Sequence, residues 1–137
     1  MKNIILYIWQ MPQNILGLLV ILFTRAKAEN YISKGGKIIC LYRTKKYNFG
    51  VSLGKYIVFG GYFDECDVLH EYGHQLQSLR LGWLYLPIIG FVSALFNNIW
   101  DRLAHKKWTI KSRNKWYYNR FPENWADKLG CVNRQRF

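Results

Sequence analysis

Residues 70–74 of this chain read HEYGH, which matches the pattern HExxH. On a helix, His70 and His74 lie one turn apart on the same face, so both imidazoles can reach one metal ion. Glu71 is one residue round the helix from His70, where its carboxylate can address a water on that metal. This segment therefore predicts two metal ligands and a base.

A second segment, residues 123–127, reads ENWAD and places Glu123 and Asp127 four residues apart. That pair can offer a third metal ligand and a carboxylate that orients one of the histidines. A catalytic zinc site has three protein ligands and keeps its fourth position for water. The two segments together therefore predict a hydrolytic zinc site.

The distribution of acidic residues supports this prediction. The chain has 20 Lys and Arg residues against 8 Asp and Glu, yet six of the eight acids fall in two short windows. The first three suit an N-cap and the first turn of a helix, and the last three have no such explanation. In chain order the six are Asp64, Glu65, Asp67, Glu71, Glu123 and Asp127.

HExxH followed by ExxAD resembles the gluzincin metallopeptidases, most closely the branch of the CAAX prenyl-protein peptidases and HtpX-like peptidases. The resemblance covers the two motifs strongly and the segment between them loosely. It implies zinc binding by His70, His74 and Glu123, general-base catalysis by Glu71, and support of a zinc-bound histidine by Asp127. The chain is far shorter than the best-known members and lacks their several membrane helices. The resemblance is thus to a minimal relative, and the substrate class is not carried over.

Length and composition indicate one domain with an anionic partner. The 137 residues can bury a core unaided, half of them are hydrophobic, and 18% are aromatic. The formal charge of +12 favours nucleic acid or an acidic membrane surface as a partner. Cys40, Cys66 and Cys131 do not form a disulfide framework and favour a reducing cytoplasm. Cys66 lies four residues before His70 and could reach the metal, although a core thiol is the commoner role.

Residues 4–23 form an apolar run of about the length that spans a bilayer. Because Arg25 and Lys27 follow at once, the rest of the chain is expected to be cytoplasmic. A core helix and a signal peptide cleaved near residues 26–28 are the alternatives to a membrane anchor. Four residues interrupt the middle of the run: Gln10, Pro12, Gln13 and Asn14.

The middle of the chain predicts a small sheet followed by the metal-binding helix. Residues 37–43, 47–53 and 55–62 have the composition of three short strands in an antiparallel meander, with an edge strand bordering the cleft. The helix is expected from Asp64 to Leu81, with Gly82 as its stop. Gly73 inside it suggests close packing against the sheet. Four residues of this helix are expected in the core: Leu69, Tyr72, Leu76 and Leu79.

Residues 83–100 form a second apolar run, whose placement the metal site constrains. If this run crossed a bilayer, His74 and Glu123 would lie on opposite sides and could not share a metal ion. The run should therefore pack in the domain, enter and leave the membrane as a hairpin, or lie in the interface. Pro87 and Gly90 suit a break in it.

Residues 101–120 mix Lys and Arg with Trp and Tyr. This mixture matches the headgroup region of an anionic membrane, and it could also bind single-stranded nucleic acid. Two apolar runs nearby favour the membrane over nucleic acid, and half of the lysines could form only a solvated face. The region also holds four candidates for stabilising a tetrahedral oxyanion, among which the sequence does not choose: His105, Tyr117, Tyr118 and Arg120.

These features predict a small α+β, zincin-like domain over residues 25–137, preceded by an apolar anchor segment over residues 1–24. Its expected activity is that of a zinc metalloendopeptidase, in which a zinc-bound water attacks a peptide or protein substrate at the cytoplasmic face of a membrane. The alternative is a membrane-associated binding or immunity-type module with a structural or non-catalytic metal. The identity of the substrate and the oligomeric state are not predicted.

Overall fold

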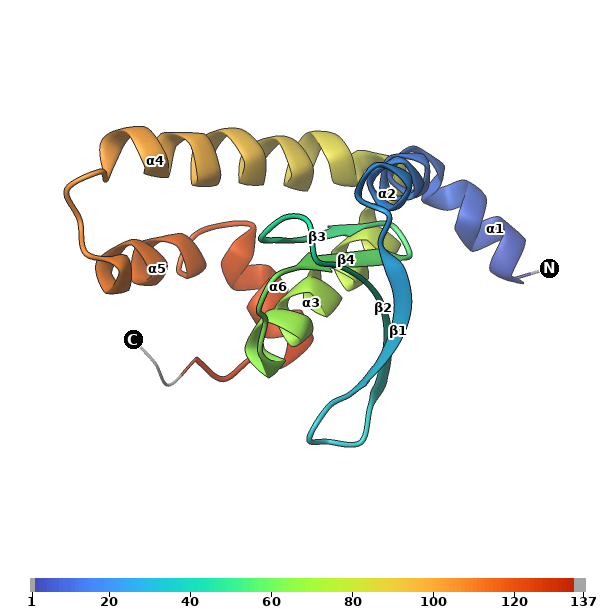
Figure 1. Cartoon of the computed structure of the whole chain (residues 1–137). Coiled ribbons are helices and arrows are strands. Elements are labelled where there is room, and N and C mark those ends of the chain that lie inside the picture. The colour runs from blue at the N-terminus through green and yellow to red at the C-terminus, as the bar shows by residue number, and fades with distance from the viewer. Residues whose placement is uncertain (1, 135–137) are drawn as a thin grey trace.

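The computed structural model describes residues 2–134 and has the predicted α+β class, with a four-stranded sheet between helices (Figure 1). The strands are β1 (Lys27–Ile32), β2 (Ile38–Thr44), β3 (Phe49–Leu53) and β4 (Tyr56–Gly60). The α-helices are α1 (Lys2–Trp9), α2 (Met11–Thr24), α3 (Glu65–Leu81), α4 (Trp100–Ala104), α5 (Ile110–Tyr118) and α6 (Glu123–Gly130). A 3-10 turn, η1 (Gly82–Leu84), and two π-helical segments, η2 (Leu86–Gly90) and η3 (Val92–Ile99), connect α3 to α4.

The sheet is mixed, so the predicted antiparallel meander is wrong. Its strand order is β1-β2-β4-β3, with β2 and β4 parallel and the other two pairs antiparallel. The strand β1 was not predicted, because most of its side chains are exposed and it shows no alternation of buried and exposed residues. β4 is buried at all five positions, which suits the centre of the sheet, whereas β3 contains Gly50 and Ser52 and forms an edge.

The core lies between the sheet and α3. Five buried side chains form it: Ile39, Leu41, Ile57, Phe59 and Val68. Leu69 and Tyr72 pack against this cluster, as predicted, but Leu79 is 37% exposed and lies at the surface. In Figure 1, α2 lies above β3 and β4 and α3 lies below them, so these two strands are covered on both sides.

The predicted bounds of the metal-binding helix are confirmed. Asp64 is the N-cap, and it forms a capping box with Asp67 in which each side chain accepts a hydrogen bond from the other residue's backbone N–H. Gly82 ends α3 with a φ of 54°.

The close packing expected at Gly73 is with α6, and not with the sheet as predicted. A Cβ atom added at Gly73 would lie 1.9 Å from the carbonyl oxygen of Ala126, so only glycine permits this contact. Gly130 of α6 makes the reciprocal contact, since its Cβ would lie 2.0 Å from the carbonyl oxygen of Leu69. The two helices therefore approach with their backbones nearly in contact.

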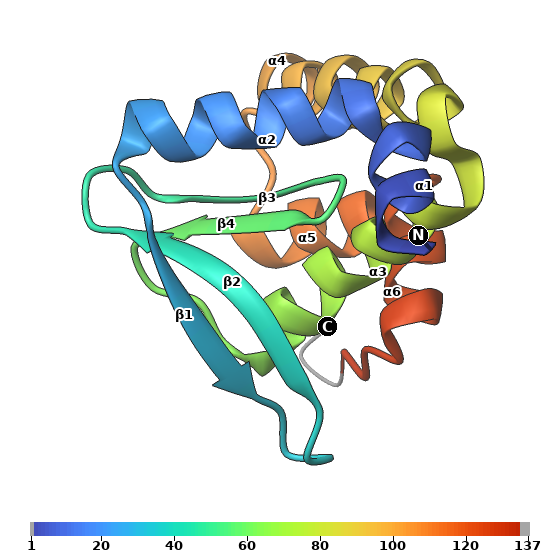
Figure 2. The same cartoon turned by 90° about the vertical axis from the view of Figure 1, so that its right-hand side faces the viewer.

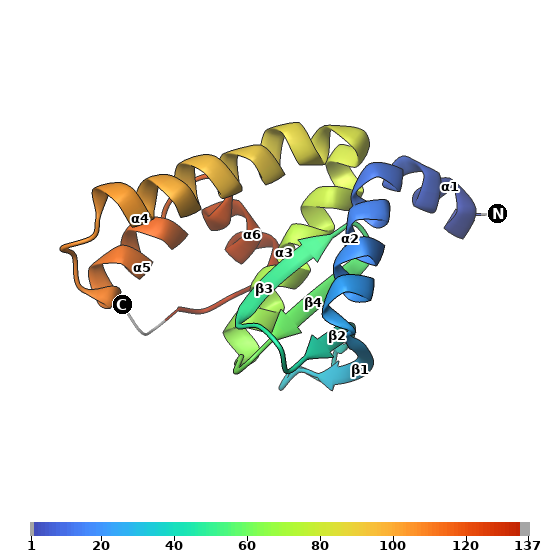
Figure 3. The same cartoon turned by 45° about the horizontal axis from the view of Figure 1, so that its top comes forward.

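Both apolar runs bend, the first where its polar interruption begins and the second at a different place from the predicted one. Residues 4–23 form two helices, because Pro12 has no backbone N–H to continue α1 and instead starts α2. In the second run, Pro87 and Gly90 lie inside one continuous rod formed by η2, η3 and α4, which we call the 86–104 helix (Figure 3). The break lies before this helix, at Gly82–Leu84.

Within residues 2–134, no helix taken singly has both the length and the apolar character needed to cross a membrane. Two strongly bent pairs of helices reach that length and composition together. They are residues 3–9 with 11–24, bent by 87°, and residues 65–84 with 86–104, bent by 117°.

Candidate metal centre

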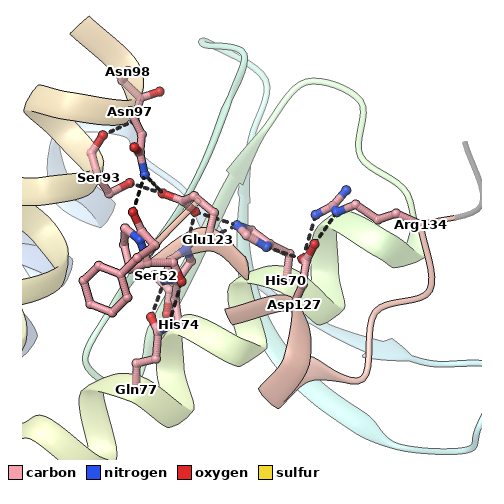
Figure 4. A network of polar contacts seen from close by, with 12 residues as sticks. Ser52, His70, His74, Gln77, Ser93, Asn97, Asn98, Glu123, Asp127 and Arg134 are labelled. Carbon is pink, nitrogen blue, oxygen red and sulfur yellow. Dashed lines mark hydrogen bonds and ion pairs between the residues drawn. The ribbon is translucent and has the colours of Figure 1, made fainter. Parts of the chain in front are cut away.

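The three predicted metal ligands meet in one buried cluster between α3 and α6 (Figure 4). The Nε2 atoms of His70 and His74 are 3.2 Å apart. Glu123 Oε2 lies 3.1 Å from the first nitrogen and 2.9 Å from the second. All three side chains are buried. The two sequence motifs, about fifty residues apart, therefore form a single group that could hold a metal ion.

The geometry of this group fits a metal ion such as zinc. Tetrahedral zinc with ligands at about 2.0–2.1 Å has ligand atoms roughly 3.3 Å from one another. The three distances in the cluster, 2.9 to 3.2 Å, are close to that spacing. Two imidazoles and one carboxylate are also a donor set that zinc accepts in hydrolytic sites.

Asp127 lies on the far side of His70, as the sequence predicted. Its Oδ1 accepts a hydrogen bond of 2.6 Å from His70 Nδ1. An ionised carboxylate only accepts, so the proton of a neutral imidazole stays on Nδ1 and Nε2 keeps a lone pair for a metal. Asp127 is itself held by Arg134, whose Nε and Nη2 donate hydrogen bonds of 2.6 and 3.0 Å to its carboxylate.

Gln77 has the same role for His74, and sequence reasoning missed it. Its side-chain nitrogen donates to the carbonyl oxygen of Pro122 at 3.0 Å, which turns its oxygen toward His74. That oxygen lies 2.7 Å from His74 Nδ1 and accepts a hydrogen bond from its N–H. The available signal was its spacing, because Gln77 lies three residues after His74 on the same helix.

Glu123 is oriented from the opposite side by the 86–104 helix (Figure 4). Ser93 Oγ donates a hydrogen bond of 2.5 Å to Glu123 Oε1, and Asn97 Nδ2 lies 3.3 Å from the same oxygen. Because these bonds use Oε1, Oε2 remains directed at the histidines. Neither Ser93 nor Asn97 was a predicted site residue, although both are polar positions in an apolar run.

His70 and Glu123 have strongly shifted pKa values. Burial on its own would lower the pKa of His70, but hydrogen bonds to Asp127 and Glu123 outweigh it and raise the pKa to about 9. Burial would raise the pKa of Glu123, and the two histidines instead hold it far below its usual value. Hydrogen bonds with the imidazoles thus stabilise the ionised form of the buried Glu123 carboxylate.

Glu71 lies beside the cluster and is not a member of it. It is buried, and burial raises the pKa of its carboxyl above the usual value despite the lowering effect of His74 and His70. Two cavities of about 440 and 550 Å³ are both lined by Glu71 and His70, and the second also by His74. The predicted base and the metal cluster therefore share open space.

The edge strand β3 lines both cavities. Its residues 49 and 50 contribute to the first and residues 50–53 to the second. A Cβ added at Gly50 would lie 3.1 Å from Glu71 Oε1, so the strand passes directly beside this carboxylate. The predicted arrangement of an edge strand along the cleft is confirmed, although the strand belongs to a mixed sheet.

The structure separates the four candidates for oxyanion stabilisation. Tyr117 lines both cavities together with Glu71, and burial raises the pKa of its hydroxyl, which keeps it a proton donor. Tyr118 lines the first cavity and packs its ring edge-on against His70. His105 stacks on Trp108, and the guanidinium of Arg120 lies over the ring of Trp116, so both are directed elsewhere.

Cys66 does not join the metal-binding group. Its Sγ lies 3.8 Å from the carbonyl oxygen of Asn133. Cys66 is only partly buried and is not in the core cluster, so the alternative role as a core thiol is wrong as well.

Comparisons of the chain with protein-family models, with curated proteins and with solved structures find no match.

Proposed function

We propose that this protein is a zinc-dependent peptide hydrolase in which Glu71 is the general base. One observation carries the proposal: a buried cluster of two histidines and a glutamate adjoins a further carboxylate, and that carboxylate lines the same two cavities as His70 of the cluster. The resemblance of the two motifs to gluzincins agrees with it. His70, His74 and Glu123 would hold the zinc, and Asp127 would fix the tautomer of His70.

When bound, zinc would polarise a carbonyl group and lower the pKa of a water molecule toward neutrality. Glu71 would accept the proton of the attacking water and then donate it to the leaving amine. Tyr117 would donate a hydrogen bond to the oxygen of the tetrahedral species, because it lines both cavities together with Glu71. Gln77, Ser93 and Asn97 would keep the ligand atoms directed inward.

Peptides are the proposed substrates because of the edge strand. In the described sheet β3 is an edge strand that pairs with β4, and its residues 49–53 line the cavities. An extended peptide can pair with the free backbone groups of such a strand, which would place its carbonyl groups near Glu71. The backbone of the substrate would then be recognised at β3 and its side chains in the cavities.

The proposal is tested by metal content and by hydrolysis of an unstructured protein. Purified protein should hold about one zinc per chain, and His74→Ala should lose it. Glu71→Gln should keep the zinc and lower hydrolysis by about 10²–10⁴-fold, the range for a lost general base. Glu29→Gln is the matched control, because Glu29 lies on β1 away from the cluster and should leave activity unchanged.

Two results would contradict the proposal. Full zinc content in His74→Ala would exclude the metal site, and unchanged hydrolysis in Glu71→Gln would exclude the base. If zinc-loaded wild-type protein hydrolyses no peptide, the metal supports a binding module, which is the alternative class.

A further inference from the structure

Helix α2 has its polar side chains inside and its apolar side chains outside. Gln10, Gln13 and Asn14 are buried, and the first two donate hydrogen bonds to Ser78 Oγ of α3. Asn14 Oδ1 accepts a hydrogen bond from the backbone N–H of Lys55. The opposite face is exposed and wholly apolar: Ile15, Leu16, Leu18, Leu19, Leu22 and Phe23. The residues that interrupt the apolar run are thus those that attach it to the domain.

The 86–104 helix shows the same inversion. Every fourth residue from Tyr85 faces the protein, and this stripe becomes polar along its length: Tyr85, Ile89, Ser93, Asn97, Asp101 and His105. An α-helix turns once in 3.6 residues, so a spacing of four would drift round it. The wider turns of η2 and η3 keep the stripe on one side. The outer face exposes Phe91, Leu95, Phe96, Ile99, Trp100 and Leu103.

The two outer faces lie on the same side of the molecule. In Figure 1 the 86–104 helix runs along the top and α2 is seen nearly end-on at the same height. After the turn of Figure 2, α2 runs along the top and the 86–104 helix lies behind it. The two crossed helices therefore form one layer, which we call the apolar layer. Exposed apolar surface of this extent marks an interaction site.

The charge of the chain is distributed to match an anionic partner at this layer. Residues 1–28 and 72–122 contain eleven Lys and Arg residues and a single acid, Asp101. Asp101 is buried and paired with Arg113. Exposed cations follow the end of each helix of the layer: Arg25 and Lys27 after α2, and Lys106 and Lys107 after α4. Exposed tryptophans lie before α2 (Trp9), before the 86–104 helix (Trp83), within it (Trp100) and after it (Trp108).

We propose that the apolar layer docks on an anionic lipid leaflet, with α2 and the 86–104 helix lying in the plane of the membrane. The apolar side chains would enter the acyl region, and the lysines, arginines and tryptophans would lie at the headgroups. A lipid surface is the partner because the layer is broad, mostly apolar along two crossed helices, and followed by exposed cations at the end of each helix. The docking is independent of the proposed hydrolysis.

Docking would also bring the candidate metal centre to the membrane. The second cavity is walled by Leu16 of α2 and by Leu86, Ile89 and Phe91 of the 86–104 helix, together with His74. Leu16 and Phe91 belong both to the exposed apolar faces and to the walls of this cavity, so the apolar layer and the cavity share side chains. This consequence rests on the proposed function, whereas the docking itself does not.

Flotation of the full chain with lipid vesicles tests the proposal. The protein should float with vesicles of phosphatidylcholine and phosphatidylglycerol. Its binding to vesicles of phosphatidylcholine alone should be weaker by a factor of about 10 or more. Brominated acyl chains should quench its tryptophan fluorescence. Leu22→Glu with Phe23→Glu should weaken binding by about 100-fold or more, since these side chains are 71% and 81% exposed and lose their lipid contacts. Trp100→Glu with Leu103→Glu tests the other helix in the same way.

The matched control is Ile32→Glu with Ile38→Glu. These side chains are 67% and 66% exposed on the β1–β2 hairpin, which Figure 1 shows on the side opposite the apolar layer. This variant should float like the wild type, and so should Glu71→Gln, which separates docking from catalysis.

Three outcomes would overturn the proposal. In the first, the wild type does not float with the vesicles. In the second, both layer variants float as well as the wild type. In the third, the control variant loses as much binding as the layer variants do. A dimer that forms without vesicles, is broken by the layer variants and binds no lipid would also overturn it, and would assign the layer to a second copy of the chain.

Discussion

The protein contains two Arg–Asp–His groups that are nearly identical in their bonding and different in what the histidine faces. In one, Arg134 and His70 both bond to Asp127, with 2.6 Å between the imidazole and the carboxylate. In the other, Arg113 and His105 both bond to Asp101, and the corresponding distance is 2.9 Å. In both, Nδ1 is the bonded imidazole nitrogen, and the pKa of the carboxyl is below its usual value.

The difference lies beyond the second imidazole nitrogen. His70 directs Nε2 at a second histidine and at Glu123. The ring of His105 instead stacks on Trp108, with 3.8 Å between ring centroids, and meets the edge of Trp116. An oriented histidine is therefore not a metal ligand on its own. In the metal site, other donor atoms converge on the second nitrogen of His70. Among the described residues, the group around Asp101 lacks this convergence and only joins the 86–104 helix to α5.

The largest contrast is expected when each histidine is removed. His70→Ala should reduce zinc from about one per chain to background, because two ligands do not hold the ion. His105→Ala should keep full zinc content and lose about 2 kcal/mol of unfolding free energy from its packing and hydrogen bond. Metal analysis and denaturant unfolding measure the two effects. Loss of zinc in both variants would remove the distinction between the groups.

A smaller contrast is expected when each aspartate is removed. Asp127→Ala should lower the zinc affinity by about 10–100-fold, the usual effect of losing the partner of a ligating histidine. Asp101→Ala should leave the affinity unchanged, since its histidine faces tryptophans. Competition with a chromophoric chelator gives both affinities. Equal losses would show that the second group also acts on the metal site.

The sequence predicted the parts of the site that depend on spacing within one helix. His70 and His74 are one turn apart on any helix, and the caps at Asp64 and Gly82 are local signals, so these predictions needed no tertiary information. The pairing of α3 with α6 followed from the motif at Glu123, because buried histidines and acids that share a metal must converge. The α+β class followed from composition in the same local way.

The parts that sequence reasoning missed depend on how elements meet. Hydrophobicity marks β4 as a strand, but its place between β2 and β3 is decided by the burial of both its faces. Arg134 reaches Asp127 only because the chain turns back after α6, which no spacing rule indicates. Ser93 and Asn97 could have been found, since a polar stripe with a spacing of four in an apolar run shows which side faces the protein.

The smallest expected effect is a pH dependence of stability, and it concerns the second Arg–Asp–His group, around Asp101. Burial on its own would raise the pKa of Asp101, but hydrogen bonds from Arg113 and His105 outweigh it and hold the pKa below its usual value. Asp101 therefore stabilises the fold above its unfolded pKa, and this contribution is lost as the pH falls through the lower folded pKa. Asp101→Asn should lower the melting temperature by a few degrees at neutral pH, and the difference should shrink below about pH 4.

Thermal unfolding with a chelator present measures this effect, because metal loss in acid then makes no contribution. Glu29→Gln is the control: its carboxylate is exposed and 3.9 Å from Arg43, so its removal should change the melting temperature little at any pH. A difference between Asp101→Asn and the wild type that grows toward acid pH would contradict the direction of the shift. A difference that shrinks would show that the second Arg–Asp–His group stabilises the fold through its charge, without any metal.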